Sequence, residues 1–240
     1  VSHELKSPLT SINGYAELIA SGMVNPDDTR RFADIIHREG VRLLNMINEI
    51  IQLSKFDTGY SDFDQREEVD LHEILREEME SLSSMAAEHH VRLESDVVGE
   101  EETNRIAFFG NRRLLADVMR NLLSNAIKYS KADGGYVLTK IHQDEHNISI
   151  IVEDDGIGIA PENQKRVFER FFTVDPGRTR TDGSGTGLGL SLVKHIVQAH
   201  EGILRLDSEL GKGSRFSILL PRDAKATASV TNETASPKQQ

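Results

Sequence analysis

The sequence predicts an α+β protein in which an N-terminal αα-hairpin precedes an α/β sandwich domain. In residues 1–57, apolar residues recur at the three- and four-residue intervals of amphipathic helices. After residue 62 the pattern changes to short apolar runs that alternate with helical stretches. We therefore expect residues 1–60 to form the hairpin, residues 61–222 to form the α/β domain, and residues 223–240, which are rich in Ala, Ser, Thr and Gln, to form a disordered tail.

The first helix is expected over residues 1–22 and carries one apolar stripe. Its members step by four, three, four and three residues: Leu5, Leu9, Ile12, Ala16 and Ile19. At about 100° per residue, His3 lies about 200° around the helix from Leu5, so its imidazole is expected to point away from the stripe into solvent. Pro8 falls within the opening turns, where it removes a backbone donor.

The second helix is expected over residues 27–57, after a loop at residues 22–28. One side of it is marked by Phe32, Ile36, Leu43, Ile47, Ile50 and Ser54, and Leu44 and Ile51 widen that side. A hairpin alone buries little apolar surface. We therefore expect it to pair with a second copy as a homodimeric four-helix bundle. A long helix of core type without a partner is the alternative.

The α/β domain is expected after a linker at residues 57–62. Strands are expected at residues 67–71, 91–97, 105–109, 136–143, 147–153, 203–207 and 215–220. Helices are expected at residues 72–88, 111–130, 161–168 and 188–200.

Composition excludes several classes of function. The net charge of −11 argues against nucleic acid as the main partner, so a polyphosphate ligand would need local donors. Zero cysteines exclude disulfides, a thiolate zinc site and a cysteine nucleophile. No run of 18 apolar residues is present, and the first residue is Val rather than Met, two positions before a motif. We expect the chain to be a piece of a longer protein, with any membrane segment outside it.

The pair His3 and Glu4 opens the first helix and is the candidate reactive centre. A neutral imidazole nitrogen is a usable nucleophile at neutral pH, and the adjacent carboxylate can orient the ring or accept its proton. A zinc site of the His-Glu-x-x-His type is excluded, because Ser7 stands where the second histidine would be. By itself the pair is more typical of a surface histidine, and only the rest of the chain favours chemistry.

Polar residues on the helix expected at residues 111–130 form a second candidate site. Asn121, Asn125 and Lys128 are spaced i, i+4 and i+7 and share one face. Asparagine costs several tenths of a kcal/mol against Ala inside a helix, so two on one stripe need a reason. An Asn carbonyl oxygen can ligate Mg²⁺, and the lysine can meet phosphate. A solvated polar face is the alternative.

Asp154, Gly156 and Gly158 directly follow the strand expected at residues 147–153. A carboxylate at a strand end can accept a hydrogen bond from an exocyclic amine, as on adenine, and glycines beside it let a flat ring approach the backbone. Because Asp-Gly turns are common, this signal is weak when it stands alone.

The stretch Gly-Ser-Gly-Thr-Gly-Leu-Gly-Leu at residues 183–190 is the strongest single signal. It leads directly into a helix, so backbone N–H groups and a positive helix end converge on one spot that can hold phosphate. It is neither a P-loop nor the strict dinucleotide-binding pattern. A flexible hinge is the alternative.

An aromatic cluster and a charged segment precede this glycine-rich stretch. Phe168, Phe171 and Phe172 are expected to form an apolar knot, for which a plain core is the alternative. The following residues, which include Arg178 and Arg180, are expected to form a mobile lid that carries cations. In either case the aromatic residues would tether the lid.

With these five stretches in order, the chain resembles the cytoplasmic core of a bacterial two-component sensor histidine kinase. It is most similar to the membrane-anchored phosphate-response and cell-wall sensor kinases. The family's H, N, G1, F and G2 boxes correspond to residues 3–8, 121–129, 154–158, 168–172 and 183–189. The resemblance covers residues 1 to about 221 and implies a dimerisation and phosphotransfer hairpin joined to an ATP-binding domain of the type found in gyrase and Hsp90.

Carried over position by position, the resemblance implies that His3 is the phosphoacceptor, Glu4 its acid/base partner and Asn125 the Mg²⁺ ligand. The residues implied to contact ATP are Asn121, Asn125, Lys128, Tyr129, Asp154, Gly156, Gly158, Arg178, Arg180, Gly185, Thr186, Gly187, Leu188 and Gly189. The family also implies autophosphorylation with ATP, transfer to an aspartate of a response regulator, and location as the cytoplasmic portion of a membrane-anchored sensor.

Two positions depart from the family pattern. Ser7 stands where Thr or Asn is usual, which bears on dephosphorylation of the partner, and Thr173 stands where many members have an Arg directed at the γ-phosphate. Arg178 or Arg180 is a candidate to compensate for the latter. These departures leave open a phosphatase-biased or pseudokinase dimeric scaffold. A related machine that hydrolyses ATP without a phosphoacceptor is disfavoured by the H box.

Overall fold

The computed structural model describes two compact units. The first unit comprises residues 1–60 and 165–192, and the second comprises residues 61–164 and 193–240. Within them, the described residues are 2–22, 24–57, 65–98, 105–174 and 185–222, with the backbone alone at residues 2–4 and 57. The predicted linker at residues 58–62 and the predicted tail at residues 223–240 lie outside the described residues.

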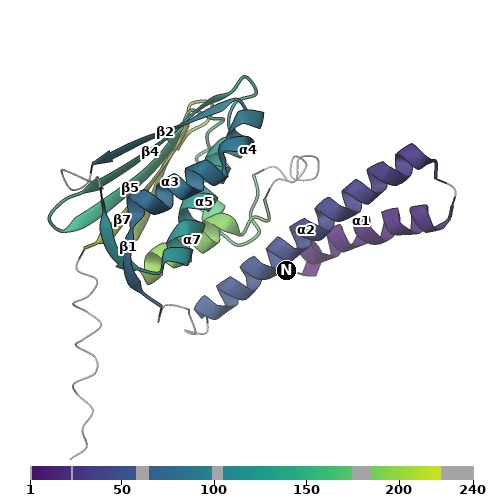
Figure 1. Ribbon diagram of the computed structural model, residues 1–240, viewed down its shortest axis with the longest axis horizontal. Helices are drawn as coiled ribbons and strands as arrows, with labels where there is room; N and C mark the ends of the chain where they lie inside the picture. The colour runs from purple at the N-terminus through teal and green to yellow at the C-terminus, as the bar shows by residue number, and fades with distance from the viewer. Residues whose placement is uncertain (1, 23, 58–64, 99–104, 175–184, 223–240) are drawn as a thin grey trace, which may run out of the picture. The chain divides into compact units, whose positions relative to one another are not determined.

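An αα-hairpin forms the N-terminal part of the first unit, as predicted (Figure 1). Its helices are α1 (Ser2–Ala20) and α2 (Pro26–Asp57). The Asn25 side chain caps the start of α2, because its Oδ1 accepts the backbone N–H of Asp28 at 2.8 Å. The Tyr15 and Phe32 rings pack across the hairpin with centroids 4.9 Å apart.

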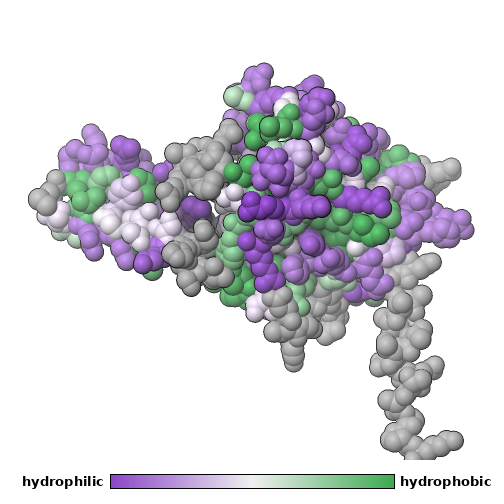
Figure 2. Space-filling view, turned by 180° about the vertical axis from the view of Figure 1, so that it is seen from behind, coloured by the Kyte–Doolittle hydropathy of each residue, from purple (hydrophilic) through white to green (hydrophobic). Residues whose placement is uncertain are grey.

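The predicted apolar stripes describe this hairpin only in part. Pro8, Met46 and Leu53 are buried, although none of them belonged to those stripes. Apolar patches are visible on the hairpin in Figure 2. The large apolar side chains that are exposed on the hairpin are Leu9, Leu18, Val41, Leu44, Ile47 and Ile51. The hairpin therefore leaves much of its apolar surface in solvent.

The second unit is built on a five-stranded mixed sheet with the strand order β2-β4-β5-β7-β6. Strands β2 and β4 are parallel, and the other neighbours are antiparallel. The strands are β2 (Val91–Val98), β4 (Gly135–Gln143), β5 (Asn147–Asp154), β6 (Ile203–Glu209) and β7 (Gly213–Pro221). A separate pair joins β1 (Glu67–Asp70) to β3 (Ala107–Gly110).

Helices cover one face of this sheet (Figure 1). They are α3 (Leu71–Ser81), α5 (Arg112–Lys128) and the part of α7 (Gly189–Ala199) that belongs to the second unit. The inward residues of each strand alternate with outward ones, as in Val137, Thr139 and Ile141 of β4, which are all buried. These side chains and the apolar faces of the helices form a continuous core.

Two predicted helices differ from the structure. The helix predicted at residues 72–88 is split into α3 and α4 (Ser83–Glu88) at Leu82, whose backbone N–H bonds to both Glu78 O and Glu80 O. The prediction of a helix at residues 161–168 was wrong. Residues 161–165 form turns, and the short 3₁₀ helix η2 (Arg166–Phe168) follows them. The N–H of Gln164 bonds to Pro161 O, an i→i−3 contact that does not continue into an α-helix.

None of the helices in the described part of the chain combines the length and the hydropathy needed to span a bilayer.

Candidate nucleotide-binding site

Helix α5 carries the polar face predicted to bind Mg²⁺ and phosphate. The helix begins because the Asn111 side chain accepts the N–H of Leu114 at 3.1 Å, and one side of it packs into the core through residues such as Leu122 and Ile127. Its other side is partly exposed, and Asn121, Asn125 and Lys128 lie there together. The predicted common face of these three residues is thus observed, whereas their binding roles stay predictions.

The segment after β5 is attached directly to the C-terminal end of α5. The N–H of Ile157 donates to Tyr129 O at 3.0 Å. Gly156 is required there, because a Cβ at this position would lie 2.4 Å from the same carbonyl oxygen. The structure therefore brings Tyr129 and the Asp154–Gly158 stretch together in the second unit, and the N–H of Gly211 at the β6–β7 turn secures that stretch by bonding Ile157 O at 2.7 Å.

The Asp154 carboxylate lies at the end of β5 in a largely buried position. Its Oδ1 accepts the N–H of Gly156 at 2.9 Å and the N–H of Ser214 at 3.3 Å. Burial raises the pKa of Asp154 to about 6, although both backbone hydrogen bonds act in the opposite direction. A carboxylate that is poorly hydrated and held at one oxygen can use the other to accept an amine hydrogen bond.

Several residues that support Asp154 were missed by the sequence analysis. Ser214 supplies an N–H to Asp154, and its hydroxyl lies 3.0 Å from that of Ser208. The Ser208 hydroxyl in turn accepts the N–H of Ile159 at 2.8 Å, and Gln164 Nε2 donates to Ser208 O at 2.7 Å. The Gly-Lys-Gly-Ser stretch at residues 211–214, which leads into β7, was the available signal, because closely spaced glycines often mark a close backbone approach.

Asp155, the neighbour of Asp154, was also missed. Its Oδ1 accepts the N–H of Tyr136 at 2.9 Å and so joins the end of β5 to the start of β4. Nothing in the spacing of the sequence distinguishes this structural carboxylate from Asp154 beside it.

The first unit holds the glycine-rich stretch and the aromatic residues before it. The N–H of Phe171 donates to Gly187 O at 2.9 Å. Gly187 has φ +71°, and a Cβ there would lie 2.7 Å from the backbone carbon of Phe171, so only glycine fits. Arg166 stacks 4.3 Å above the Phe172 ring centroid. The predicted aromatic cluster is thus tied to the stretch by backbone contact.

The remaining residues of this stretch lead into α7. The Thr186 hydroxyl accepts the N–H of Leu188 at 3.2 Å and donates to the carboxylate of Glu49 on α2, which belongs to the same unit. Gly185 is partly exposed, Leu188 is buried, and Gly189 is the first residue of α7. The predicted placement of the glycines directly before a helix is observed.

Some predicted site residues lie outside the described part of the chain. These are Arg178 and Arg180, and also the side chains of His3 and Glu4, although the backbone of both is part of α1. Of the two positions that depart from the family pattern, Ser7 is exposed and Thr173 is partly buried.

Among the described residues, no group of three or more His, Asp or Glu side chains could hold a metal ion. The amide oxygens of α5 are hard donors of the kind that Mg²⁺ takes in small number beside water and phosphate. Asn125 and Asn121 therefore fit a Mg²⁺–nucleotide better than a dedicated metal cage.

Two family models match the chain. The model of the His Kinase A (phospho-acceptor) domain matches residues 1–59, and the model of the histidine kinase-, DNA gyrase B- and HSP90-like ATPase matches residues 110–224. The sensor-like histidine kinase SenX3 of Mycolicibacterium smegmatis is 39% identical over 221 residues, which are 92% of this chain and 56% of SenX3. The chain thus spans about half the length of the curated relatives it matches.

Solved structures agree with these matches. The mycobacterial sensor histidine kinase MprB is 30% identical and superposes with a TM-score of 0.54, covering 65% of this chain and 97% of MprB. The histidine kinase ThkA, solved in complex with the response regulator protein TrrA, has a TM-score of 0.72 and covers 94% of this chain and 61% of that one. Its identity is 22%, so this second likeness concerns the fold alone.

Proposed function

Because the chain belongs to the sensor histidine kinases of two-component signalling, we propose that it transfers the γ-phosphoryl group of ATP to His3 and then to an aspartate of a response regulator. One observation carries the proposal. The Tyr129–Ile157 hydrogen bond attaches the Asp154 stretch to the C-terminal end of α5, the helix that carries the polar face. In the same chain, the first helix carries a histidine within a match to a phospho-acceptor domain. Neither the family models nor the relatives favour the alternative of a scaffold in which nucleotide only sets conformation.

The described residues would offer partners of suitable chemistry to the adenine, the metal and the phosphates of Mg²⁺–ATP. The Asp154 carboxylate would accept the adenine amine, and Lys128 and Tyr129, at the end of α5, would line the nucleotide. The amide oxygen of Asn125 would hold Mg²⁺, which neutralises phosphate charge when bound. The backbone of Gly185, Gly187 and Gly189, with Thr186 and Leu188, would wrap the phosphates at the start of α7.

The proposed chemical step is an in-line phosphoryl transfer. A ring nitrogen of His3 attacks the γ-phosphorus, the nitrogen–phosphorus bond forms, and the bond to the β–γ bridging oxygen breaks as ADP leaves with the electron pair. Glu4 takes the proton of the ring or orients it. Phosphoryl transfer depends mainly on such positioning and on charge neutralisation, which matches a site built from amide oxygens, backbone N–H groups and a lysine.

We further propose two protein partners. The exposed apolar residues of the hairpin support a homodimer through a four-helix bundle. Membership of the sensor histidine kinases supports a receiver domain as the second substrate, and ThkA, which shares the fold, was solved with a response regulator protein. The chain is proposed to act on the cytoplasmic side of a membrane-anchored sensor, where ATP and such regulators are present.

Autophosphorylation with γ-labelled ATP tests the proposal. The unaltered chain should gain label that is acid-labile and base-stable, as expected for a phosphoramidate, and His3→Gln should abolish it. Label of that stability on His3→Gln would contradict the assignment of His3. Transfer profiling against purified receiver domains would then identify the acceptor.

A further inference from the structure

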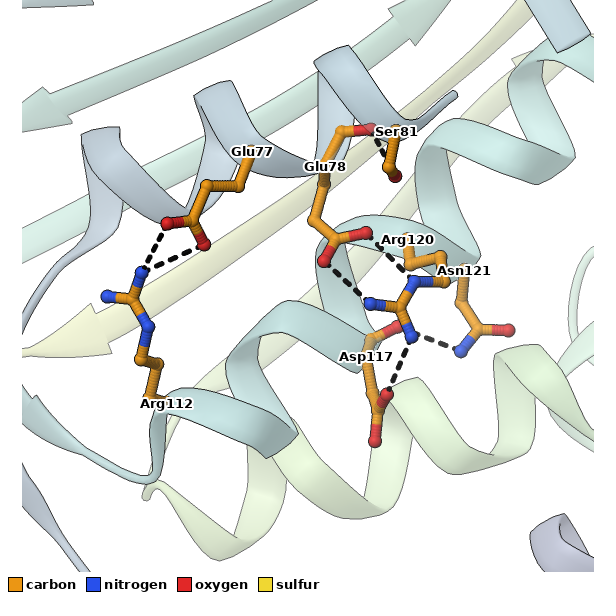
Figure 3. A network of polar contacts seen from close by, with 7 residues as sticks. All are labelled: Glu77, Glu78, Ser81, Arg112, Asp117, Arg120 and Asn121. Carbon is orange, nitrogen blue, oxygen red and sulfur yellow. Dashed lines mark hydrogen bonds and ion pairs between the residues drawn. The ribbon is translucent and has the colours of Figure 1, made fainter. Parts of the chain in front are cut away.

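An ion pair with a buried carboxylate and a half-exposed arginine joins α3 to α5, next in sequence to Asn121 of the proposed Mg²⁺–nucleotide site. The side chain of Glu78 on α3 is only 8% exposed, on the same buried face as Ile74 and Leu75. Arg120 on α5 meets it with a two-pronged contact, Nε to Oε2 at 2.8 Å and Nη2 to Oε1 at 2.7 Å (Figure 3). Hydrogen bonding to Glu78 is the main reason that the pKa of Arg120 is raised above its ordinary value. Since an unpaired carboxylate is costly to bury, this fork fixes the α5 turn against α3.

The same turn of α5 fixes the orientation of the Asn121 amide. Arg120 Nη1 lies 3.5 Å from Asp117 Oδ1, and Asn121 Nδ2 donates to the Asp117 carbonyl oxygen at 2.8 Å. Only the amide nitrogen can donate to a carbonyl, so this contact decides which end of the amide is oxygen. The carbonyl oxygen of Asn121 therefore points away from the helix backbone, as Figure 3 shows.

We propose that Glu78 and Arg120 are positioning residues that make Asn121 present its carbonyl oxygen to the Mg²⁺–nucleotide. Neither residue touches the nucleotide. They hold the turn at residues 117–121 in place, and that turn holds the Asn121 amide. The inference rests on the proposed function, because it assumes that the polar face of α5 binds Mg²⁺–ATP.

A second ion pair between the same two helices provides a matched control. Arg112 at the start of α5 contacts both carboxylate oxygens of Glu77 at 2.8 Å (Figure 3). It also contacts Glu73 Oε2 at 3.0 Å. This second ion pair also combines an arginine with carboxylates and joins the same helices, but its Glu77 side chain is exposed where Glu78 is buried. Arg112 precedes Asn121 by nine residues, about 13 Å along the helix axis. Loss of this pair should loosen the helix packing without turning the Asn121 amide.

The experiment compares Glu78→Gln with Glu77→Gln in the full chain. The affinity for ATP is measured by calorimetry with Mg²⁺ and again with EDTA, and the ratio of the two dissociation constants reports the gain due to the metal. Glu78→Gln should reduce that gain about tenfold, which is typical for loss of a residue that orients a metal-site ligand. The dissociation constant for ATP measured with EDTA should change little. Glu77→Gln should leave the gain within about twofold of the unaltered chain.

Arg120→Lys separates positioning from folding. It keeps the charge opposite Glu78 but removes the fork, so the metal-dependent gain should fall to an intermediate value. If Glu78→Gln and Arg120→Lys lower the melting temperature yet keep the full gain, the ion pair is structural only and the inference is overturned. If the unaltered chain itself shows no binding of Mg²⁺–ATP, the proposed function fails instead.

Discussion

The helical hairpin and the sheet-based unit solve the burial of apolar side chains in opposite ways. The hairpin leaves Leu44 62% exposed and Ile51 51% exposed on a single helix. In the second unit the core strands and helices cover their own apolar faces, and residues such as Ile141 and Leu123 are fully buried. The difference indicates that the sheet unit is complete by itself, whereas the hairpin needs a second apolar surface. The dependence on association can be tested separately for the hairpin and for the sheet-based unit.

The largest effect is expected from charges on the exposed face of the hairpin. Leu44→Glu together with Ile51→Glu would place four carboxylates in the proposed homodimer interface, where each lost apolar side chain alone is worth about 1.5–3 kcal/mol. Dimerisation should weaken by at least about 6 kcal/mol in total. Sedimentation velocity at micromolar concentration should then show a monomer where the unaltered chain is a dimer.

Leu210→Glu serves as the control for that experiment. Leu210 is 64% exposed but lies in the turn between β6 and β7 of the second unit. Its substitution should leave the dimer intact. A double variant of the hairpin that remains dimeric would remove the distinction between the two regions.

The next largest effect is expected in the core of the sheet unit. Ile141 on β4 is completely buried, so Ile141→Ala should create a cavity and lower the free energy of unfolding by about 2–5 kcal/mol. Ile203→Ala, on the edge strand β6 of the same sheet with 52% exposure, should cost less than about 0.5 kcal/mol. Chemical unfolding followed by circular dichroism measures both, and equal losses would contradict a self-contained core.

The sequence predicted the fold class well because both regions carry strong periodic signals. The hairpin, the sheet strands and the long helix at α5 were placed within two residues of their observed ends. The failures came where local hydrogen bonds override periodicity. Residues 161–165 had a helical spacing but form turns, and Leu82 interrupts a stretch with a continuous apolar pattern.

On α5, the sequence predicted a common polar face because two residue types are unusual for a helix. Asn121 and Asn125 stand out because asparagine is disfavoured inside a helix, and their common face is observed. Glu78 and Arg120 did not stand out, because charged residues are ordinary on a helix and their burial depends on the packing of α3 against α5. Ser214 is similar, since it acts through a backbone N–H that any residue could supply.

A smaller effect is expected in the pH dependence of nucleotide affinity, which depends on Asp154 of the sheet-based unit. With the pKa of Asp154 raised by burial to about 6, the carboxylate is mostly ionised at pH 7 and roughly one-tenth ionised at pH 5. The neutral acid accepts a hydrogen bond from the adenine amine less well, so affinity for ADP without metal should fall by up to about tenfold across that range. Asp154→Asn should bind more weakly at pH 7 and show a flatter profile, which keeps only the pH dependence due to the ADP phosphate itself. A profile for the unaltered chain as flat as that of Asp154→Asn would contradict the assignment of Asp154.

The smallest effect concerns His200, buried at the end of α7. Its Nδ1 donates to Ile196 O at 2.8 Å, so Nε2 is left to accept the N–H of Asn111 at 3.2 Å. Burial is the main reason that the pKa of His200 lies below its ordinary value of 6.5, and the charge of Arg66 acts in the same direction. The unfolded chain therefore binds the proton first as the pH falls. The stability that neutral His200 contributes is present above about pH 6.5 and is lost as the pH falls through the lower pKa of the folded state.

His200→Gln should accordingly cost about 1 kcal/mol of unfolding free energy at pH 7.5, and the cost should shrink towards pH 5. Asp154 acts with the opposite sign, because its raised pKa gives a contribution present below pH 3.8 that is lost as the pH rises through about 6. The His200→Gln variant and the unaltered chain share this contribution of Asp154. It therefore cancels when the free energies of urea unfolding of the two are compared at each pH. A difference that stays constant from pH 7.5 to pH 5 would show that protonation of His200 is not coupled to the folding of the sheet unit.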